Sequence, residues 1–211
     1  MHAEKLPAPT DKSTGSTRRT QEQRRAEAER RVLDAAMTLI AQNGSRAITL
    51  AQVGEAAGYS RGIVHQYFGN RAGLLEAVMG DAGTFDVPDY DGHALDQIAD
   101  LVASYFRNVV NRTPSSRAFL QLWGEAIAAD PVLTPLFAER DASFRTFLAN
   151  RIKAGIVDGS VRADIDPKSA AVLLLSILRG TGLQLIANPP VRNLTTLIAE
   201  AKRSVAAALR A

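Results

Sequence analysis

Residues 49–75, TLAQVGEAAGYSRGIVHQYFGNRAGLL, decide the fold of this 211-residue chain. The stretch predicts two short helices joined by a tight turn and followed by a third helix. Thr49 stands three places before Gln52, which is the spacing of a capping box, so we expect the first helix to begin at Leu50. Gly58 adopts a positive φ at little cost, as a tight turn requires. The pattern is that of a helix-turn-helix.

The second helix of this stretch follows Ser60, a favoured N-cap residue, and is about two turns long. Val53 and Ala57 on the first helix stand at the four-residue spacing of a buried face. Val64 and Phe68 have the same spacing on the second helix. We expect these four apolar side chains to lock the two helices across the turn.

The outward face of the second helix combines hydrogen-bond donors, one small residue and an apolar group, a mixture that suits base edges in a DNA major groove. We expect phosphate contacts to set the register of the helix-turn-helix on the duplex and contacts to base edges to read the sequence. The candidate base-reading residues are Arg61, Ile63 and Gln66, and the candidate phosphate contacts are Thr49, His65 and Arg71. The predicted DNA-contacting set is completed by Gln52, Ser60, Gly62 and Tyr67.

Residues 58–75 resemble the DNA-binding signature of the TetR family of bacterial transcriptional regulators. The matching residues are Gly58, Ser60, Gly62, Tyr67, Phe68, Leu74 and Leu75. Two positions depart from the usual form, since Ile63 replaces a threonine that reads a base and His65 replaces a tyrosine that touches a phosphate. The resemblance implies an all-α fold, with an N-terminal three-helix helix-turn-helix head and a C-terminal helical bundle that dimerises.

The distribution of charge agrees with DNA binding by the N-terminal part. Residues 1–80 contain 11 Lys and Arg against 8 Asp and Glu, whereas residues 81–211 contain 14 of each kind. No acidic residue occurs between Glu55 and Glu76, so the helix-turn-helix should present a positive potential to phosphates. An ordinary solvated surface is the alternative explanation of a net charge of +3. The absence of Cys excludes disulfides and thiolate metal sites, and it fits a reducing compartment.

Composition divides the chain into three parts. Residues 1–19 are rich in Pro, Ser, Thr and Gly, and they predict a disordered basic arm that either enters a minor groove or is a solvated tail. Residues 20–82 form the predicted helix-turn-helix DNA-binding domain, and residues 93–211 form the predicted helical ligand-binding and dimerisation domain. The arm lacks the apolar segment of a signal peptide, so we expect a cytoplasmic protein.

The last two predicted helices indicate a homodimer. Asp166 and Pro167 begin a helix in which AAVLLLSILRGTGLQLIA, from residue 170, is apolar on nearly every side. Its uncharged run before Arg179 is too short to span a bilayer, so we expect protein to cover the helix and no membrane partner. Ser176, Gly180 and Gly182 are small enough for close helix approach. One face is predicted to pack on the body and the other on a two-fold mate, beside a final helix at about 191–210.

The resemblance also implies an effector, a small molecule of unknown identity that binds in the helical body. Aromatic residues and one isolated cation are the candidates to contact it, although core packing is the alternative for each aromatic side chain. The candidates are Tyr105, Phe106, Phe119, Trp123, Phe144, Phe147 and Arg179. Arg179 would pair either with an anionic ligand or with a carboxylate of the protein.

The sequence therefore predicts a sequence-specific transcriptional regulator, namely a repressor that a small molecule releases from a palindromic double-stranded operator. A transcriptional activator with the same head is one alternative, and a helical ligand carrier or enzyme is another. No G-x-S-x-G, H-E-x-x-H or Walker glycine loop occurs, so we expect no enzyme and no cofactor. An EF-hand alignment on Gly92 fails because Val87 and Ile98 fall at ligand positions, so we also expect no metal.

Overall fold

The computed structural model describes residues 20–82, 92–111, 113–187 and 192–211. Within these ranges the regular elements are nine helices, and one isolated antiparallel β-bridge joins Val161 to Arg210. The helices are α1 (Gln21–Asn43), α2 (Leu50–Ala57), α3 (Arg61–Phe68), α4 (Arg71–Ala82), α5 (Ala94–Asn111), α6 (Thr113–Ile127), α7 (Leu133–Asp158), α8 (Pro167–Ile186) and α9 (Leu194–Leu209). The all-α prediction is confirmed, whereas the predicted arm lies outside the described residues.

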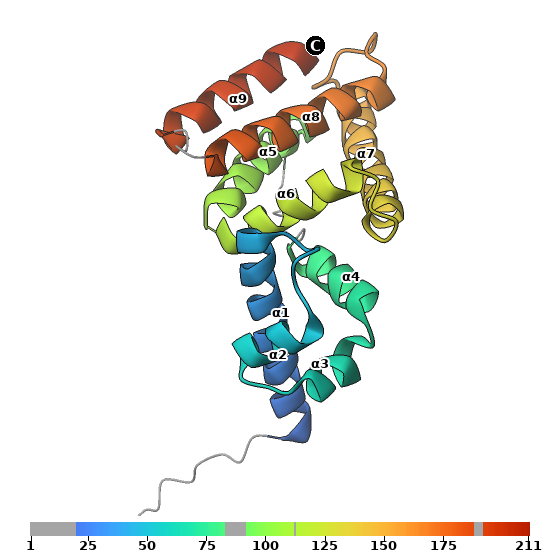
Figure 1. The fold of residues 1–211 in the computed structure, drawn as a ribbon. Coiled ribbons are helices and arrows are strands. Elements are labelled where there is room, and N and C mark those ends of the chain that lie inside the picture. The colour runs from blue at the N-terminus through green and yellow to red at the C-terminus, as the bar shows by residue number, and fades with distance from the viewer. Residues whose placement is uncertain (1–19, 83–91, 112, 188–191) are drawn as a thin grey trace, which may run out of the picture.

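The helices form two stacked parts (Figure 1). Helices α1 to α4 make a small head, and α5, α7, α8 and α9 make most of a larger body. Helix α6 lies between them and packs against α1 and α4 on one side and against α7 on the other. The head thus presents α2 and α3 at the end of the molecule far from α8 and α9.

Caps fix the predicted helix boundaries of the head. Thr20 forms a capping box with Gln23 at the start of α1, and Thr49 forms one with Gln52 at the start of α2. Gly58 ends α2 in the left-handed region, with φ 77° and ψ 27°. The sequence predicts all three boundaries, since Gln23 follows Thr20 at the same three-residue spacing, and each boundary depends on contacts within four residues.

The N-terminus of α3 differs in detail. Ser60 occupies the N-cap position with φ −78° and ψ 158°, as predicted, but its hydroxyl makes no capping hydrogen bond. The next helix, α4, is capped by Asn70, whose Oδ1 accepts a hydrogen bond of 3.0 Å from the Gly73 amide. The Ser60 hydroxyl is therefore not used to stabilise its own helix.

One hydrophobic core crosses the predicted boundary between head and body. Val32, Val53, Val64 and Leu75 in the head are fully buried. The same cluster continues into α6 and the start of α7 through Ala118, Phe119, Leu122, Ala126, Leu133 and Phe137. The head is therefore completed by a helix that the sequence assigns to the body.

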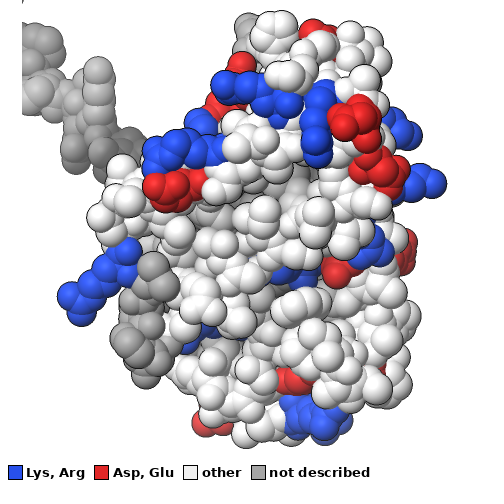
Figure 2. Space-filling model, turned by 90° about the horizontal axis from the view of Figure 1, so that it is seen from above, with Lys and Arg blue, Asp and Glu red and all other residues white. Residues whose placement is uncertain are grey.

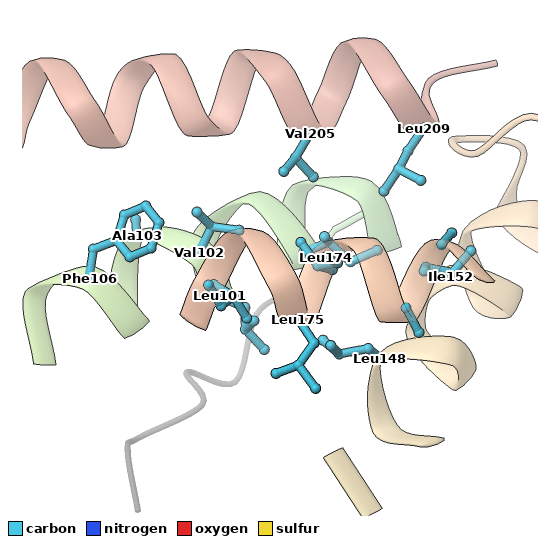
Figure 3. Packing of buried hydrophobic residues seen from close by; sticks show 14 of the residues in the cluster. Leu101, Val102, Ala103, Phe106, Leu148, Ile152, Leu174, Leu175, Val205 and Leu209 are labelled. Carbon is cyan, nitrogen blue, oxygen red and sulfur yellow. The ribbon is translucent and has the colours of Figure 1, made fainter. Parts of the chain in front are cut away.

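A second core holds the body together (Figure 3). Phe106 and Val102 of α5 are fully buried, and they belong to the cluster in which Leu174 of α8 and Val205 of α9 also lie. The labelled side chains in Figure 3 point inward from α5, α7, α8 and α9. In this core α8 and α9 both pack against α5, and α8 also packs against α7.

Pro131 and Pro135 interrupt the segment before the long helix, so the sequence predicts that this helix begins near Pro135. Helix α7 begins at Leu133 rather than near Pro135, because Asp130 Oδ1 accepts hydrogen bonds from the Val132 amide at 3.0 Å and the Leu133 amide at 3.1 Å. Pro135 then falls in the first turn, where no intrahelical amide bond is lost. Pro114 is the second residue of α6, and α5 ends before it at Asn111, as a proline at this position predicts.

Asp158, at the end of α7, caps the start of α5. Its Oδ2 accepts a hydrogen bond of 2.8 Å from the Ala94 amide, and its Oδ1 accepts one of 2.9 Å from the Ser160 amide. The Ala94 amide hydrogen bond and those from Ser160 lower the pKa of Asp158 from 3.8 to about 2, because they favour the ionised carboxylate. The charged form of Asp158 therefore joins the two helices.

Helix α8 begins as predicted, with Asp166 as N-cap and Pro167 as the first helical residue. It is long and apolar enough to cross a membrane by length and composition, but half of its most apolar window is buried inside the fold. The outward face of the same helix is also apolar, with Leu173 66% exposed and Leu183 47% exposed. Gly182 packs inward, and a Cβ atom there would lie 3.3 Å from the Tyr105 ring of α5, which agrees with the predicted close approach of helices at this glycine.

Candidate DNA-binding face and effector cavity

Close contact between α2 and the turn holds α3 in place. Val53 and Val64 are fully buried, as predicted, and they pin the two helices together. Gly54 is also buried, and a Cβ atom there would lie 2.9 Å from the carbonyl oxygen of Tyr59. Only glycine allows this approach, a role that the sequence analysis missed. The available signal was a glycine directly after a buried valine in a capped helix.

The predicted DNA-contacting residues lie mainly on one exposed surface. Ile63 and Tyr67 are half-buried at its edge, and Arg71 is half-buried at the start of α4. The exposed members are Thr49, Gln52, Ser60, Arg61, Gly62, His65 and Gln66. The structure thus brings the side chains of the predicted set that belong to α2 and α3 to the outside of the head.

No contact within the chain requires a glycine at position 62. A Cβ atom on Gly62 would meet only the Ser60 hydroxyl oxygen, at 3.6 Å, which is an ordinary van der Waals distance. Its φ is not positive, so backbone strain does not require glycine either. A glycine that the fold does not need, on an exposed helix start, leaves space for close approach from outside.

A groove between α1 and α3 adds basic residues to this face. The guanidinium of Arg25 lies over the Tyr67 ring, 5.8 Å from its centroid. The groove is lined by Gln21, Arg24, Arg25, Glu27, Ala28, Arg31, Tyr59, Gln66 and Tyr67. The sequence analysis did not assign Arg31 or Tyr59 to the DNA-binding face. The seven-residue spacing of Arg24 and Arg31, which places them on one side of a helix, was the available signal.

Arg71 is engaged inside the protein. Its Nη2 donates a hydrogen bond of 2.8 Å to the hydroxyl of the fully buried Ser45. Ser45 in turn donates from its amide, at 2.8 Å, and from its hydroxyl to the carboxylate of Glu125 on α6. The three residues connect α4, the α1–α2 loop and α6. The predicted phosphate contact of Arg71 stays a prediction, and it would require the guanidinium to turn away from Ser45.

A cavity of about 580 Å³ lies between α4, α5, α6, α7 and α8. Four of the seven predicted ligand contacts line it, namely Tyr105, Phe119, Phe144 and Arg179. The other lining residues are Glu76, Met79, Gly80, Ala82, Asn108, Val109, Ser116, Leu120, Leu136, Glu139, Arg140 and Ser143.

The other three predicted ligand contacts do not line the cavity. Phe106 is fully buried in the core of the body, where its ring packs edge-on against Tyr105 at 6.1 Å. Phe147 stacks on Phe144, with ring centroids 6.1 Å apart. Trp123 is partly buried against the core that the head shares with α6, and the Arg179 guanidinium lies over its ring. Core packing, the alternative weighed for each aromatic residue, describes these three positions.

Arg179 is the most unusual residue of the cavity. It is only 6% exposed, its Nη2 forms an ion pair with Asp141, and its guanidinium carbon lies 4.8 Å from the Phe119 ring centroid. Its Nη1 is buried and has no hydrogen-bond partner. The predicted ion pair within the body is therefore present, and one nitrogen of this cavity-lining residue has no hydrogen-bond partner.

Burial changes the acid–base properties of two neighbours. Burial raises the pKa of the Tyr105 phenol, because the ionised form is costly in an apolar site. Burial and then the positive charge of Arg179 lower the pKa of Arg140. Within the described residues, no three side chains of the His, Asp or Glu type come together as they would around a metal ion.

Sequence comparisons assign both parts of the chain. The family model for bacterial regulatory proteins of the tetR family matches residues 32–78, and that for the C-terminal part of BetI-type transcriptional repressors matches residues 94–210. The chain is 28% identical over 173 residues to the HTH-type transcriptional repressor KstR2 of Rhodococcus jostii, covering 78% of each protein.

Solved structures have the same fold. A complex of SmeT with triclosan matches with a TM-score of 0.73 and 22% identity, covering 88% of this chain and 92% of that one. A regulator from Saccharomonospora viridis in complex with choline matches with a TM-score of 0.66 and 17% identity, covering 88% and 99%. The two family models and the likeness to KstR2 show that the chain belongs to the TetR family and is a DNA-binding transcriptional regulator, not an enzyme.

Proposed function

We propose that this protein is a cytoplasmic repressor that binds a palindromic operator as a homodimer and leaves it when a small molecule occupies the cavity. The exposed surface of α3 is the observation that carries this proposal. Arg61, Gly62, His65 and Gln66 are all exposed there, although Val64 on the same helix is fully buried. Helix α3 is anchored by its buried side and carries hydrogen-bond donors on its exposed side. This arrangement suits insertion of the helix into a major groove.

Each exposed side chain has a role that its chemistry suggests. Arg61 donates two hydrogen bonds to a guanine edge, and Gln66 pairs with an adenine edge. Ile63 offers its half-buried methyl surface to a thymine. Thr49 and His65 donate to phosphates and thereby fix the register of the head on the duplex.

The apolar outer face of α8 supports dimerisation through α8 and α9. Leu173 and Ile177 lie one turn apart and are 66% and 38% exposed. Figure 2, which views this end of the molecule, shows uncharged residues over most of the centre and charged residues mainly towards the edges. A two-fold mate that packs there would place two α3 helices in successive major grooves, about 34 to 36 Å apart.

The cavity offers a route from effector to head. Its walls include Glu76, Met79, Gly80 and Ala82, which all belong to α4. A ligand that fits the cavity better when α4 moves would shift the dimer towards a spacing that no longer matches the operator. Structural neighbours crystallised with triclosan and with choline support a ligand site in this type of body.

Selection from a random pool of double-stranded DNA, at a stated salt concentration, tests the proposal. The expected result is one enriched palindrome whose half-sites are about one helical turn apart. Enrichment of no sequence over bulk competitor would overturn the proposal. Enrichment of a single half-site would instead contradict the dimeric arrangement.

A transcriptional activator with the same head is the second candidate. A reporter gene placed behind the selected palindrome separates the two functions. Lower expression in the presence of the protein, restored by an effector, is expected of a repressor. Higher expression in its presence would show an activator.

A further inference from the structure

We propose that the effector is an amphipathic organic anion, whose negative group binds Nη1 of Arg179 while its apolar part fills the rest of the cavity. This inference rests on the proposed function only in assigning the bound anion a regulatory role. The binding itself is a property of the body and can be measured without DNA.

The unsatisfied nitrogen of Arg179 is the first observation. Arg179 is 6% exposed, and Asp141 occupies its Nη2 but not its Nη1. A buried donor without an acceptor is unfavourable, and native proteins rarely keep one. A carboxylate or sulfonate placed beside Arg179 would accept this hydrogen bond and form a charge-assisted pair.

The balance of charge around Arg179 is the second observation. Arg140 also lines the cavity, and its guanidinium carbon lies 5.3 Å from the centroid of Phe119. With Asp141 these two arginines leave a net charge of +1 next to the ring. The acidic lining residues Glu76 and Glu139 are exposed, so water screens them more strongly. The inner end of the cavity thus favours an anion.

The same arrangement disfavours a quaternary ammonium ligand. Such a cation is usually held by several free aromatic faces. Here the Arg179 guanidinium lies 4.8 Å from the Phe119 ring centroid and 5.2 Å from that of Trp123. The protein's own cation therefore already lies over Phe119, one of the aromatic rings that line the cavity.

The remainder of the wall requires an apolar ligand body. Leu120 and Phe144 face the cavity from α6 and α7, and Met79 and Val109 face it from α4 and α5. The volume of about 580 Å³ is in the range of sites for drug-sized molecules. A small inorganic anion would leave these apolar walls uncovered.

Two matched fluorescent probes test the proposal in the full-length protein. 8-Anilinonaphthalene-1-sulfonate is an anion, and N-phenyl-1-naphthylamine is nearly the same molecule without the sulfonate. We expect the anion to bind at least about tenfold more tightly, because a charge-assisted hydrogen bond contributes at least that factor. Equal affinity for the two probes would overturn the proposal.

Variants locate the bound anion. Arg179→Met is expected to weaken binding of the sulfonate probe about tenfold or more and to leave binding of the neutral probe unchanged. Arg107→Met is the matched control, because Arg107 is exposed on α5 and does not line the cavity. Asp141→Asn removes the competing carboxylate and should strengthen sulfonate binding severalfold. Unchanged sulfonate affinity in both Arg179→Met and Asp141→Asn would exclude the assigned site.

Displacement distinguishes the ligand classes. Decanoate is expected to displace the bound sulfonate probe at lower concentrations than decanol or decyltrimethylammonium. Displacement by decyltrimethylammonium at the lowest concentration would overturn the proposal. A negative result in these titrations would not affect the proposal that the head selects an operator. A negative result in the DNA selection would not affect the proposal that the body binds an anion.

Discussion

Two glycines of the helix-turn-helix have opposite surroundings. A Cβ atom on Gly54 would lie 2.9 Å from the Tyr59 carbonyl oxygen, whereas one on Gly62 would meet nothing closer than 3.6 Å. The fold therefore requires the first glycine and not the second. The space beside Gly62 is available to a partner outside the chain.

Gly62→Ala should separate folding from DNA binding. We expect the free energy of unfolding to change by less than about 1 kcal/mol, because alanine is tolerated in a helix. Operator affinity should fall, because the new methyl group occupies the space that the DNA enters. Denaturant titration and a DNA-binding assay measure the two effects. Gly54→Ala is the control, with an expected loss of about 1 to 3 kcal/mol of stability from overpacking, and unchanged operator affinity in Gly62→Ala would contradict the docking geometry.

Arg61→Ala should change which sequence is preferred. We expect a loss of about 1 to 3 kcal/mol at one operator position and a relaxed preference there, because the bidentate contact to a base is removed. Binding to every single-base variant of the selected palindrome measures the effect. An equal loss for all variants would show that Arg61 contacts phosphate only.

At the scale of elements, the junction between α5 and α7 depends on one carboxylate. The ionised form of Asp158 accepts the Ala94 and Ser160 amides, and its pKa is lowered from 3.8 to about 2. Because the pKa of Asp158 is lower in the folded state than in the unfolded chain, its ionised carboxylate stabilises the fold at any pH above the ordinary pKa of an aspartate. This contribution is lost as the pH falls from about 4 towards about 2.

Asp158→Asn should therefore make stability less sensitive to acid. We expect the variant to lose less stability than the wild type between pH 4 and pH 2, because the carboxylate that takes up the proton is gone. Urea titrations across this range measure the difference. Asp164→Asn is the control, since its side chain is 76% exposed and caps no described helix. The same pH dependence in Asp158→Asn and the wild type would contradict the capping role.

The buried link between head and body is also a matter of elements. Glu125 on α6 accepts two hydrogen bonds from Ser45, which also accepts one from Arg71. Glu125→Ala should lower the free energy of unfolding by about 1 to 3 kcal/mol, because the buried Ser45 amide loses its acceptor. Denaturant titration measures the loss. The exposed pair of Glu200 with Arg203 provides the control, and Glu200→Ala should cost at most about 1 kcal/mol; equal losses would contradict the assignment.

At the scale of the whole molecule, α8 has two apolar sides and the single chain covers one. The uncovered residues recur at positions 172, 173, 176, 177, 180 and 183, which is a continuous helical stripe. Leu173→Asp should raise the dimer dissociation constant at least about tenfold, because a carboxylate would be desolvated in the interface. Sedimentation velocity at several concentrations measures it. Ile127→Asp is a matched control, since Ile127 is 67% exposed on α6, and equal dissociation constants for the two variants would contradict the proposed interface.

The sequence predicted what depends on neighbouring residues and missed what depends on distant ones. The capping boxes at Thr20 and Thr49 and the turn at Gly58 are local, and all three are present. The packing of Gly54 on Tyr59 and the burial of Phe106 depend on segments brought together by folding. Arg179 illustrates both situations. Its position as a lone charge in an apolar helix could be read from the sequence, whereas its ion-pair partner Asp141, 38 positions away, could not.

The shared core has a consequence for protein engineering. Hybrid regulators are built by joining the DNA-binding part of one protein to the sensing part of another. In this chain a join between α4 and α5 would separate Leu75 from Leu122 and Ala126, which belong to the same hydrophobic cluster. A functional hybrid should therefore include these α6 side chains together with α1 to α4, so that the transferred DNA-binding part keeps its complete hydrophobic core.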